Sequence, residues 1–273
     1  MNTPSEQQQT LLQRFVAACE SDTRVVAAFL GGSFAAGRAD EQSDLDIYLI
    51  TADEAYDDFF ARRQAFMRGL GEPVFLEDFN DFGFDMLIFT FADGVEGELA
   101  LARESNFAHT HGGPYEVLVD KKGLLAGAFF PLLAPSEADQ RKTLRCLIYW
   151  FWEDVSHFIT SMNRGHLWLA YSYIEQPRRK CVNLAHLAHD FTAEPAGYAK
   201  VEEDVPEGQL LALQSTFCPL EPRAMLEAVR VLVEVYRQIA RPLAAKYEID
   251  YPAGVERVLS MRLEELSDRI RNG

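Results

Sequence analysis

A glycine-rich turn and a pair of aspartates near the start of the chain are the residues whose types and spacing could do chemistry. Gly31, Gly32 and Ser33 follow a short apolar run, and Asp44 and Asp46 open a second one. A Gly-Ser turn lets backbone N–H groups and a hydroxyl approach phosphate oxygens without an intervening side chain. Carboxylates two residues apart on an extended segment leave the same face and can hold divalent cations. The pattern predicts a triphosphate cradle beside a metal site suited to displacement at phosphorus.

The spacing of these residues resembles the signature of the DNA polymerase beta-like nucleotidyltransferase superfamily. That signature is an apolar residue, Gly, Gly or Ser, a spacer, and then Asp-x-Asp or Asp-x-Glu, matched here by Gly32, Ser33, Asp44 and Asp46. Within the superfamily the chain is similar to lincosamide nucleotidyltransferases and, less closely, to aminoglycoside adenylyltransferases. Three further segments carry this likeness: residues 32–37, 97–99 and 117–123.

The resemblance implies an enzyme that moves a nucleoside monophosphate from a nucleoside triphosphate to a hydroxyl of a small molecule. ATP is the expected co-substrate, Mg²⁺ the expected cofactor and pyrophosphate the leaving group. Asp44 and Asp46 would hold the metal, and Gly32 and Ser33 the triphosphate. Aminoglycosides and lincosamides are the first acceptors to test, so antibiotic resistance is the expected role. The partner is a small molecule, and the chain is expected to be a monomer or a homodimer.

A third carboxylate is needed to accept the proton of the acceptor hydroxyl or to complete the metal site. The resemblance places it at Glu98, in a segment that reads as a strand. Glu96, two residues earlier on the same face, is the rival and a candidate substrate ligand, and Asp85 is a more distant choice. A hairpin whose acidic residues are merely solvated is the alternative without a function.

Other candidate ligands are spread along the chain. Guanidinium groups pair with phosphate oxygens through two hydrogen bonds, so basic residues are candidates for the triphosphate. The candidates for nucleotide binding are Arg38, Ser43, Arg178 and Arg179; those for the acceptor are Glu96, Trp152 and Glu153. A solvated basic helix face and an aromatic core stripe are the structural alternatives. His109 and His111 are spaced like a metal pair but lie in a Gly/Pro-containing loop with no third ligand in view.

The elements around these residues predict an α+β protein in two parts. Residues 6–20 and 55–69 show helical periodicity, and strands are expected at 25–30, 45–51, 84–91, 95–102 and from 117 into a turn near 123. Ala92-Asp93-Gly94 suggests a hairpin turn. Helices are expected near 136–163, 166–192, 221–246 and 252–271, with residues 193–220 as an irregular connection. We therefore predict a catalytic domain with a mixed sheet at 1–130, then a helical bundle domain at 136–273 that contributes to substrate and nucleotide binding.

Composition narrows the class of partner. With 273 residues and 48% hydrophobic residues the chain can bury a core. The net charge of −16 argues against binding to a nucleic-acid backbone and mildly favours a cationic acceptor, although acidity also serves solubility. No long apolar run predicts a membrane span, and the N-terminus lacks a signal-peptide pattern, so a cytoplasmic protein is expected. The 4 cysteines form no Cys-x-x-Cys pair.

Two other functions fit the same motif. One is a protein-modifying nucleotidyltransferase of the toxin–antitoxin type, but the helical second domain argues against it. The other is a nucleotide-binding sensor with an inactive site, but the intact pair Asp44 and Asp46 argues against it.

Overall fold

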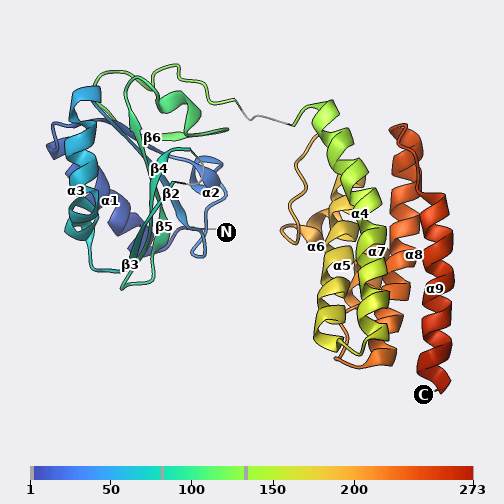
Figure 1. Cartoon of the computed structure of the whole chain (residues 1–273). Helices are drawn as coiled ribbons and strands as arrows, with labels where there is room; N and C mark the ends of the chain where they lie inside the picture. Colours follow the sequence, from blue (N-terminus) through green and yellow to red (C-terminus); the bar gives the residue numbers. More distant parts are fainter. Residues whose placement is uncertain (1–2, 81–82, 132–134, 273) are drawn as a thin grey trace. The chain divides into compact units, whose positions relative to one another are not determined.

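The computed structural model describes residues 3–80, 83–131 and 135–272. The chain divides into two compact units, Met1–Leu133 and Ala134–Gly273 (Figure 1). Buried side chains form separate cores in the two units, on both faces of the sheet in the first and among the helices in the second.

The first unit is built on one mixed sheet. Its strands are β1 (Val25–Leu30), β2 (Leu45–Thr51), β3 (Pro73–Phe79), β4 (Asp85–Phe91), β5 (Glu96–Arg103) and β6 (Glu116–Asp120). Their order is β3-β4-β5-β2-β1-β6, with β2 and β5 parallel and the other pairs antiparallel. All positions of β1 are buried, as its apolar sequence predicts for a strand covered on both faces.

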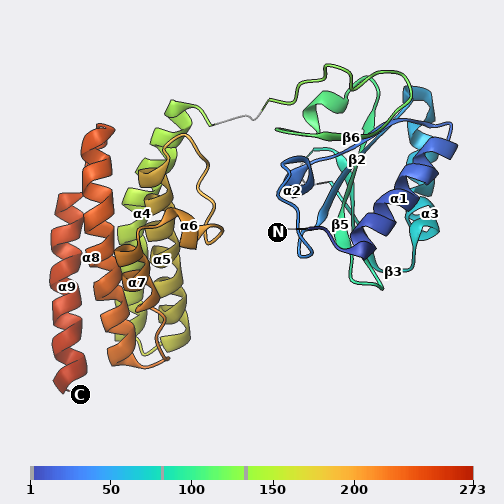
Figure 2. The same cartoon turned by 180° about the vertical axis from the view of Figure 1, so that it is seen from behind.

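Two helices cover one face of this sheet, α1 (Glu6–Ser21) and α3 (Tyr56–Leu70), which lie side by side (Figure 2). Leu11, Phe15 and Cys19 form the buried stripe of α1, at the spacing expected of an amphipathic helix. The chain between β5 and β6 and the segment after β6 cover part of the other face, where Phe130 packs against Phe29 of β1. Short helical turns are α2 (Gly32–Ala35), η1 (Asp53–Ala55) and η2 (Phe107–His109).

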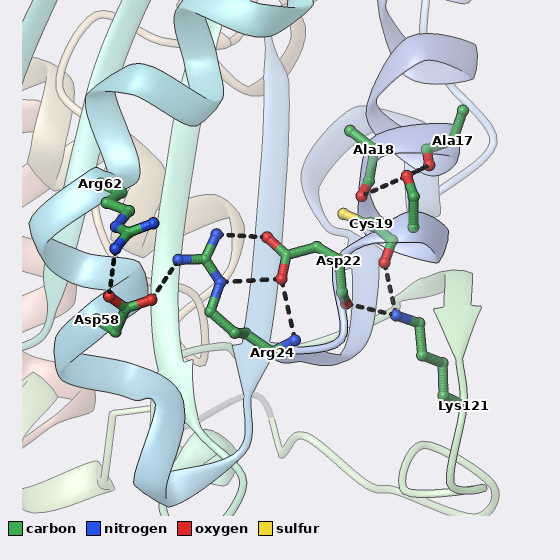
Figure 3. Close-up of polar contacts among 9 residues, drawn as sticks. Ala17, Ala18, Cys19, Asp22, Arg24, Asp58, Arg62 and Lys121 are labelled. Carbon is green, nitrogen blue, oxygen red and sulfur yellow. Dashed lines mark hydrogen bonds and ion pairs between the residues drawn. The ribbon is translucent and has the colours of Figure 1, made fainter.

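Polar contacts tie the C-terminal end of α1 to the sheet and to α3 (Figure 3). Arg24 donates two hydrogen bonds to the carboxylate of Asp22, at 2.9 and 2.6 Å, and a third to Asp58 of α3 at 2.7 Å. Arg62 pairs with the other oxygen of Asp58. Lys121 donates to the carbonyl oxygens of Cys19 and Asp22, which the helix end leaves without an intrahelical partner. Every charge in this network has an opposite charge or a dipole against it.

The second unit is helical. Its long helices are α4 (Glu137–Asn163), α5 (Leu167–His189), α8 (Pro222–Lys246) and α9 (Ala253–Asn272), with the short α6 (Val201–Asp204) and α7 (Glu207–Gln214) between α5 and α8. Ser136 caps α4 by accepting a hydrogen bond from the backbone N–H of Asp139. Within the described residues, no helix combines the length and the apolar content that crossing a bilayer requires.

The fold class predicted from the sequence is confirmed: a mixed sheet with helices is followed by a helical region. Two expectations need correction. No strand was expected at 73–79, where β3 forms the sheet edge; all of its positions are exposed or half-buried, and its sequence lacks a clear apolar alternation. Residues 193–220 were expected to be irregular but contain α6 and α7, and Val201, Val205 and Leu213 anchor this segment in the helical core.

Candidate active site

The turn after β1 brings the backbone against Asp46. The backbone N–H of Gly31 donates to the carbonyl oxygen of Asp46 at 2.9 Å, which fixes the start of α2 beside the start of β2. Gly32 has φ +54°, and a Cβ built there would lie 1.7 Å from Oδ2 of Asp46. Any other residue would be strained and would displace that carboxylate. The glycine of the motif is therefore required twice, for the backbone conformation and for the position of Asp46.

The side chain of Ser33 places a polar atom in the turn after β1. Its Oγ is buried and has no hydrogen-bond partner among the described residues. The first N–H groups of a helix also lack intrahelical acceptors, and Ser33 lies in the first turn of α2. Buried polar atoms are rarely left unpaired because each costs free energy, so an orphan hydroxyl in a turn indicates a place where a ligand oxygen can bind.

The parallel pairing of β2 and β5 brings the acidic residues together. Asp46 lies opposite Glu98 in the register, while Asp44 directly precedes β2. Beside this pair, Gly97 lies opposite Leu45, and a Cβ at Gly97 would approach the Leu45 carbonyl oxygen to 2.4 Å. The glycine thus permits the close approach of the two strands that sets Glu98 next to the aspartates.

The other two candidate carboxylates do not lie opposite Asp46. Glu96 is exposed and opposite Thr90, one strand position before Gly97. Asp85 lies opposite Leu101 and accepts a 2.5 Å hydrogen bond from the hydroxyl of Tyr56. Of the three acidic residues considered from the sequence, Glu98 is the one that the register pairs with Asp46.

The site brings together several carboxylates that repel one another. Burial, with the charges of Asp44 and Glu98 adding to it, raises the pKa of Asp46 to about 6. Burial and the charge of Asp44 also raise the pKa of Glu98. None of these carboxylates forms an ion pair within the described part of the chain. Nor does any group of three or more His, Cys, Asp or Glu side chains there enclose a metal position by itself. A bound cation would relieve this repulsion.

Two hollows border these carboxylates. The first, which we call the acidic hollow, has a volume of about 460 Å³ and includes Glu41, Asp44, Asp93 and Glu96 in its lining. The second, the aromatic pocket, has a volume of about 500 Å³ and includes Gly32, Asp46, Tyr48, Phe84 and His111. Gly32, the glycine of the predicted phosphate cradle, therefore lines the aromatic pocket, whereas Asp44 lines the acidic hollow.

The remaining expected nucleotide ligands have varied environments. Arg38 and Arg179 are exposed. The hydroxyl of Ser43 is already used, because it accepts from the backbone N–H of Asp40 at 3.0 Å and donates to its carboxylate at 3.1 Å. Ser43 thereby closes the loop that leads into Asp44.

Arg178 calls for a correction. Only 2% of it is exposed, and it lies within the helical core instead of on an open basic face. Its Nε and one terminal nitrogen donate to Thr216 at 2.8 Å, the other pairs with Glu175, and the group lies 4.0 Å from the ring centroid of Phe217. With all three nitrogens engaged, Arg178 anchors the segment after α7 to α5 and has no free donor face for a phosphate.

The helical unit brings its two expected acceptor ligands to one hollow. Trp152 and Glu153 of α4 line a hollow of about 580 Å³ with Ser156 and residues of α9 that include Val255 and Val258. Glu153 is exposed, but Trp152 is only 1% exposed and stacks edge-on against Tyr236. Trp152 is thus primarily a core residue, which agrees with the alternative that the aromatic stripe belongs to the core, and it only borders the hollow.

Three residues at the site were missed from the sequence. Gln8 is buried, and its side-chain amide donates to the carbonyl oxygens of Asp40 and Ser43, which holds the loop before Asp44. The Ser5-x-x-Gln8 capping box could have identified it. Tyr48 follows Asp46 on the same strand face, a relation that period two predicts. His111 was considered from the sequence only as half of a metal pair with His109, and its place beside Asp46 was missed; it is packed among aromatic rings, and no metal-binding group of three or more such side chains occurs in the described part of the chain.

A strand, a Gly-Ser turn and a second strand bearing paired aspartates, set in a mixed sheet, define a nucleotidyltransferase of the DNA polymerase beta-like class. The chain belongs to the streptomycin adenylyltransferase family, whose sequence model matches residues 5–264.

Two solved structures are similar over nearly the whole chain. One is an aminoglycoside 6-adenyltransferase from Bacillus subtilis, with 16% identity over 97% of this chain and 99% of that one and a TM-score of 0.44. The other is a nucleotidyltransferase-like protein from Exiguobacterium sibiricum, with 10% identity over 97% and 91% and a TM-score of 0.36. A search of curated protein sequences gave no match. The family assignment rests on the family model.

Proposed function

We propose that the protein transfers AMP from ATP to a hydroxyl of a small-molecule acceptor and releases pyrophosphate. One observation carries this proposal: Asp46 lies opposite Glu98 across two parallel strands, and its carboxylate occupies the place where a Cβ of Gly32 would lie, one residue before Ser33 and its unpaired hydroxyl. Paired carboxylates and a phosphate cradle at one place are what nucleotidyl transfer needs, and the membership in an adenylyltransferase family supports ATP as the donor.

The donor set suits Mg²⁺. This ion prefers carboxylate oxygens and is usually bound through one or two carboxylates together with substrate phosphates and water. Asp44 and Asp46 offer two carboxylates, and their mutual repulsion with Glu98 favours a bound cation. When bound, the metal would neutralise charge on the phosphates during transfer. We assign Asp44 and Asp46 to the metal, and Gly32, Ser33 and Arg38 to the triphosphate, with Arg179 as a further cationic candidate in place of the buried Arg178.

Glu98 is proposed as the group that accepts the proton of the acceptor hydroxyl. A general base must lie within hydrogen-bond reach of that proton and must be ionised at the working pH. Glu98 is half-buried beside Asp46, and its raised pKa makes it a stronger base than an exposed glutamate. The carboxylate of Glu98 would receive the proton at Oε as the hydroxyl oxygen attacks the α-phosphorus, and pyrophosphate would depart toward the Gly-Ser turn.

For the acceptor we propose a hydroxyl-bearing antibiotic, with streptomycin first because the family carries that name. Glu96 borders the acidic hollow with Glu41 and Asp93, and this lining suits the cationic groups of an aminoglycoside. Glu153, in its hollow on the helical unit, is a second proposed contact. An ATP-dependent enzyme of this kind would act in the cytoplasm.

The test is a panel assay with the full-length protein. Pyrophosphate release is measured for each nucleoside triphosphate with Mg²⁺, against a panel of aminoglycosides, lincosamides and other hydroxyl-bearing antibiotics. Mass spectrometry then identifies the product. We expect release with ATP and streptomycin and an acceptor heavier by one AMP, and none with the Asp46→Asn variant. AMP attached to a co-purified protein, or no release with any acceptor, would reject the proposal.

A further inference from the structure

The aromatic pocket beside Asp46 is lined by aromatic side chains to which the proposed mechanism gives no role. Tyr48 and His111 both line it. Phe29 stacks in parallel on Tyr48, with 4.6 Å between ring centroids, so one face of the Tyr48 ring is already covered. His111 makes an edge contact with the same ring at 4.7 Å. What Tyr48 presents to the pocket is its remaining surface, next to the carboxylate of Asp46.

Gly31 shows that this arrangement is built into the motif. A Cβ at Gly31 would lie 2.9 Å from Cε1 of His111 and 2.9 Å from Cε2 of Tyr48, which is too close for any other residue without a shift of both rings. Gly32 makes the corresponding allowance for Asp46. The two glycines therefore leave space for different neighbours. Gly32 leaves space for the carboxylate of Asp46, and Gly31 leaves space for the two rings.

The rings are held firmly. His111 donates from Nε2 to the carbonyl oxygen of Pro114 at 2.9 Å and packs against Phe130 at 5.1 Å between centroids. Burial lowers the pKa of His111, so its ring is uncharged at neutral pH. On the β5 side, the residue opposite Tyr48 is the buried Ala100. The pocket thus offers rigid, uncharged aromatic walls next to the phosphate cradle.

The charge of the two hollows separates their occupants. A triphosphate is repelled by the acidic hollow, whose lining contains Glu41, Asp44, Asp93 and Glu96. The aromatic pocket includes Gly32 of the cradle, and Asp46 is its acidic residue. Aromatic rings bind nucleobases by stacking, and they do so without needing a charge on the base. A volume of about 500 Å³ lies in the usual range for small-molecule sites.

We infer that Tyr48 and His111 form the subsite for the nucleobase of the nucleoside triphosphate. The base lies against these rings while its phosphates reach the Gly32-Ser33 turn, and the acidic hollow is left for the acceptor. This inference rests on the proposed function, since it concerns the nucleotide of that reaction.

Two ligands separate a base subsite from a phosphate subsite. Binding of Mg²⁺ with the non-hydrolysable analogue α,β-methylene-ATP, and of Mg²⁺ with inorganic tripolyphosphate, is measured by isothermal titration on the full-length protein. The variants are His111→Ala, Tyr48→Ala and the ring-retaining His111→Phe and Tyr48→Phe. We expect the alanine variants to lose about tenfold or more in affinity for the analogue, the range for removing one stacking ring. Tripolyphosphate should bind them as it binds the parent.

Retention of the ring should restore most of the affinity, and unchanged tripolyphosphate binding by the alanine variants shows that they are folded. Equal losses for both ligands would overturn the inference, because the rings would then be supporting the cradle or Asp46. Unchanged analogue binding with a raised KM for the acceptor would also overturn it, because the pocket would then bind the acceptor. If the parent binds neither ligand, the proposed function fails and the inference with it, an outcome distinct from both others.

Discussion

Acidic residues lie near both ends of β1, but their charges are balanced at one end and unbalanced at the other. At the end near Val25, Asp22 and Asp58 are paired with Arg24, and Arg62 completes the network (Figure 3). Hydrogen bonds from Arg24 lower the pKa of Asp22 below its ordinary value. At the end near Leu30, burial and like charges raise the pKa of Asp46.

This contrast indicates which end is built for stability and which for a ligand. A carboxylate with its cation in place stabilises the fold when it is ionised, whereas an unpaired carboxylate near others costs stability and becomes useful only when a cation arrives. The same division holds for neutral polar atoms. The carbonyl oxygens at the end of α1 are satisfied by Lys121, while Oγ of Ser33 in α2 has no hydrogen-bond partner in the part of the chain that the structure describes.

The largest effect is expected from exchanging one aspartate at each end. Asp46→Asn should lower nucleotidyl transfer by at least about 10³-fold, the upper range for removing one charge-stabilising group. Asp58→Asn, at the paired end, should leave turnover unchanged and cost less than about 1 kcal/mol of stability, because the pair is half exposed. Steady-state pyrophosphate release and thermal melting on both variants measure this. Comparable activity losses in the two variants would remove the distinction between the ends.

A second test concerns the two glutamates of β5. Glu98→Gln should keep binding of Mg²⁺ and the ATP analogue while lowering turnover by about 10²–10⁴-fold, the usual contribution of a positioned base. Glu96→Gln is the matched control and should change mainly the KM of a cationic acceptor. The rate of the parent should fall toward low pH as the carboxylate protonates, and this limb should vanish in Glu98→Gln. A fully active Glu98→Gln with an inactive Glu96→Gln would pass the role of base to Glu96.

Two glycines with similar backbone angles give the third test. Gly32 and Gly37 have φ +54° and +65°, but a Cβ at Gly32 meets Asp46 whereas a Cβ at Gly37 meets nothing within 4 Å. Both alanine variants should lose about 1 kcal/mol from the strained conformation. Only Gly32→Ala should also weaken Mg²⁺-dependent binding of the ATP analogue, by about tenfold or more, since it displaces a proposed metal ligand. Titration of both variants decides, and equal affinities would show that Asp46 tolerates the displacement.

How much of this was visible in the sequence depends on the range of the interactions. Local signals identified β1, β2, α1, α3 and the β4–β5 hairpin, because apolar periodicity and the turn at Asp93-Gly94 are short-range properties. The pairing of Asp46 with Glu98 came from resemblance, since the parallel register of β2 and β5 depends on contacts far apart in sequence. Arg178 read as a surface cation because no local pattern shows that Thr216 and Phe217 enclose it.

The smallest expected effect is on stability, and its sign should differ between the two ends. The folded pKa of Asp46 is raised to about 6, so between about pH 4 and 6 the native state holds a proton that the unfolded state has lost. Stability therefore falls as pH rises through this window, and the cost is fully present above it. For Asp22, whose pKa is lowered, the ionised form adds stability at neutral pH that is lost as pH falls below about 4.

At pH 8 without divalent metal, Asp46→Asn should thus raise the melting temperature of the N-terminal unit by a few degrees, and Asp22→Asn should lower it. A raised pKa of this size corresponds to at most about 3 kcal/mol, which partial exposure of Asp46 reduces to on the order of 1 kcal/mol. The gain in melting temperature of Asp46→Asn should shrink below pH 6 and disappear near pH 4.

Calorimetry across pH with EDTA present measures the melting temperature of both variants. The transition of the N-terminal unit is identified as the one that Mg²⁺ and the ATP analogue shift in the parent. Adding Mg²⁺ and the ATP analogue should then make the parent more stable than Asp46→Asn, because only the parent retains the proposed metal ligand and gains the full stabilisation that binding confers on the native state. A destabilised Asp46→Asn at pH 8 without metal would mean that its carboxylate is satisfied in the fold, which would remove the electrostatic basis for placing a cation there.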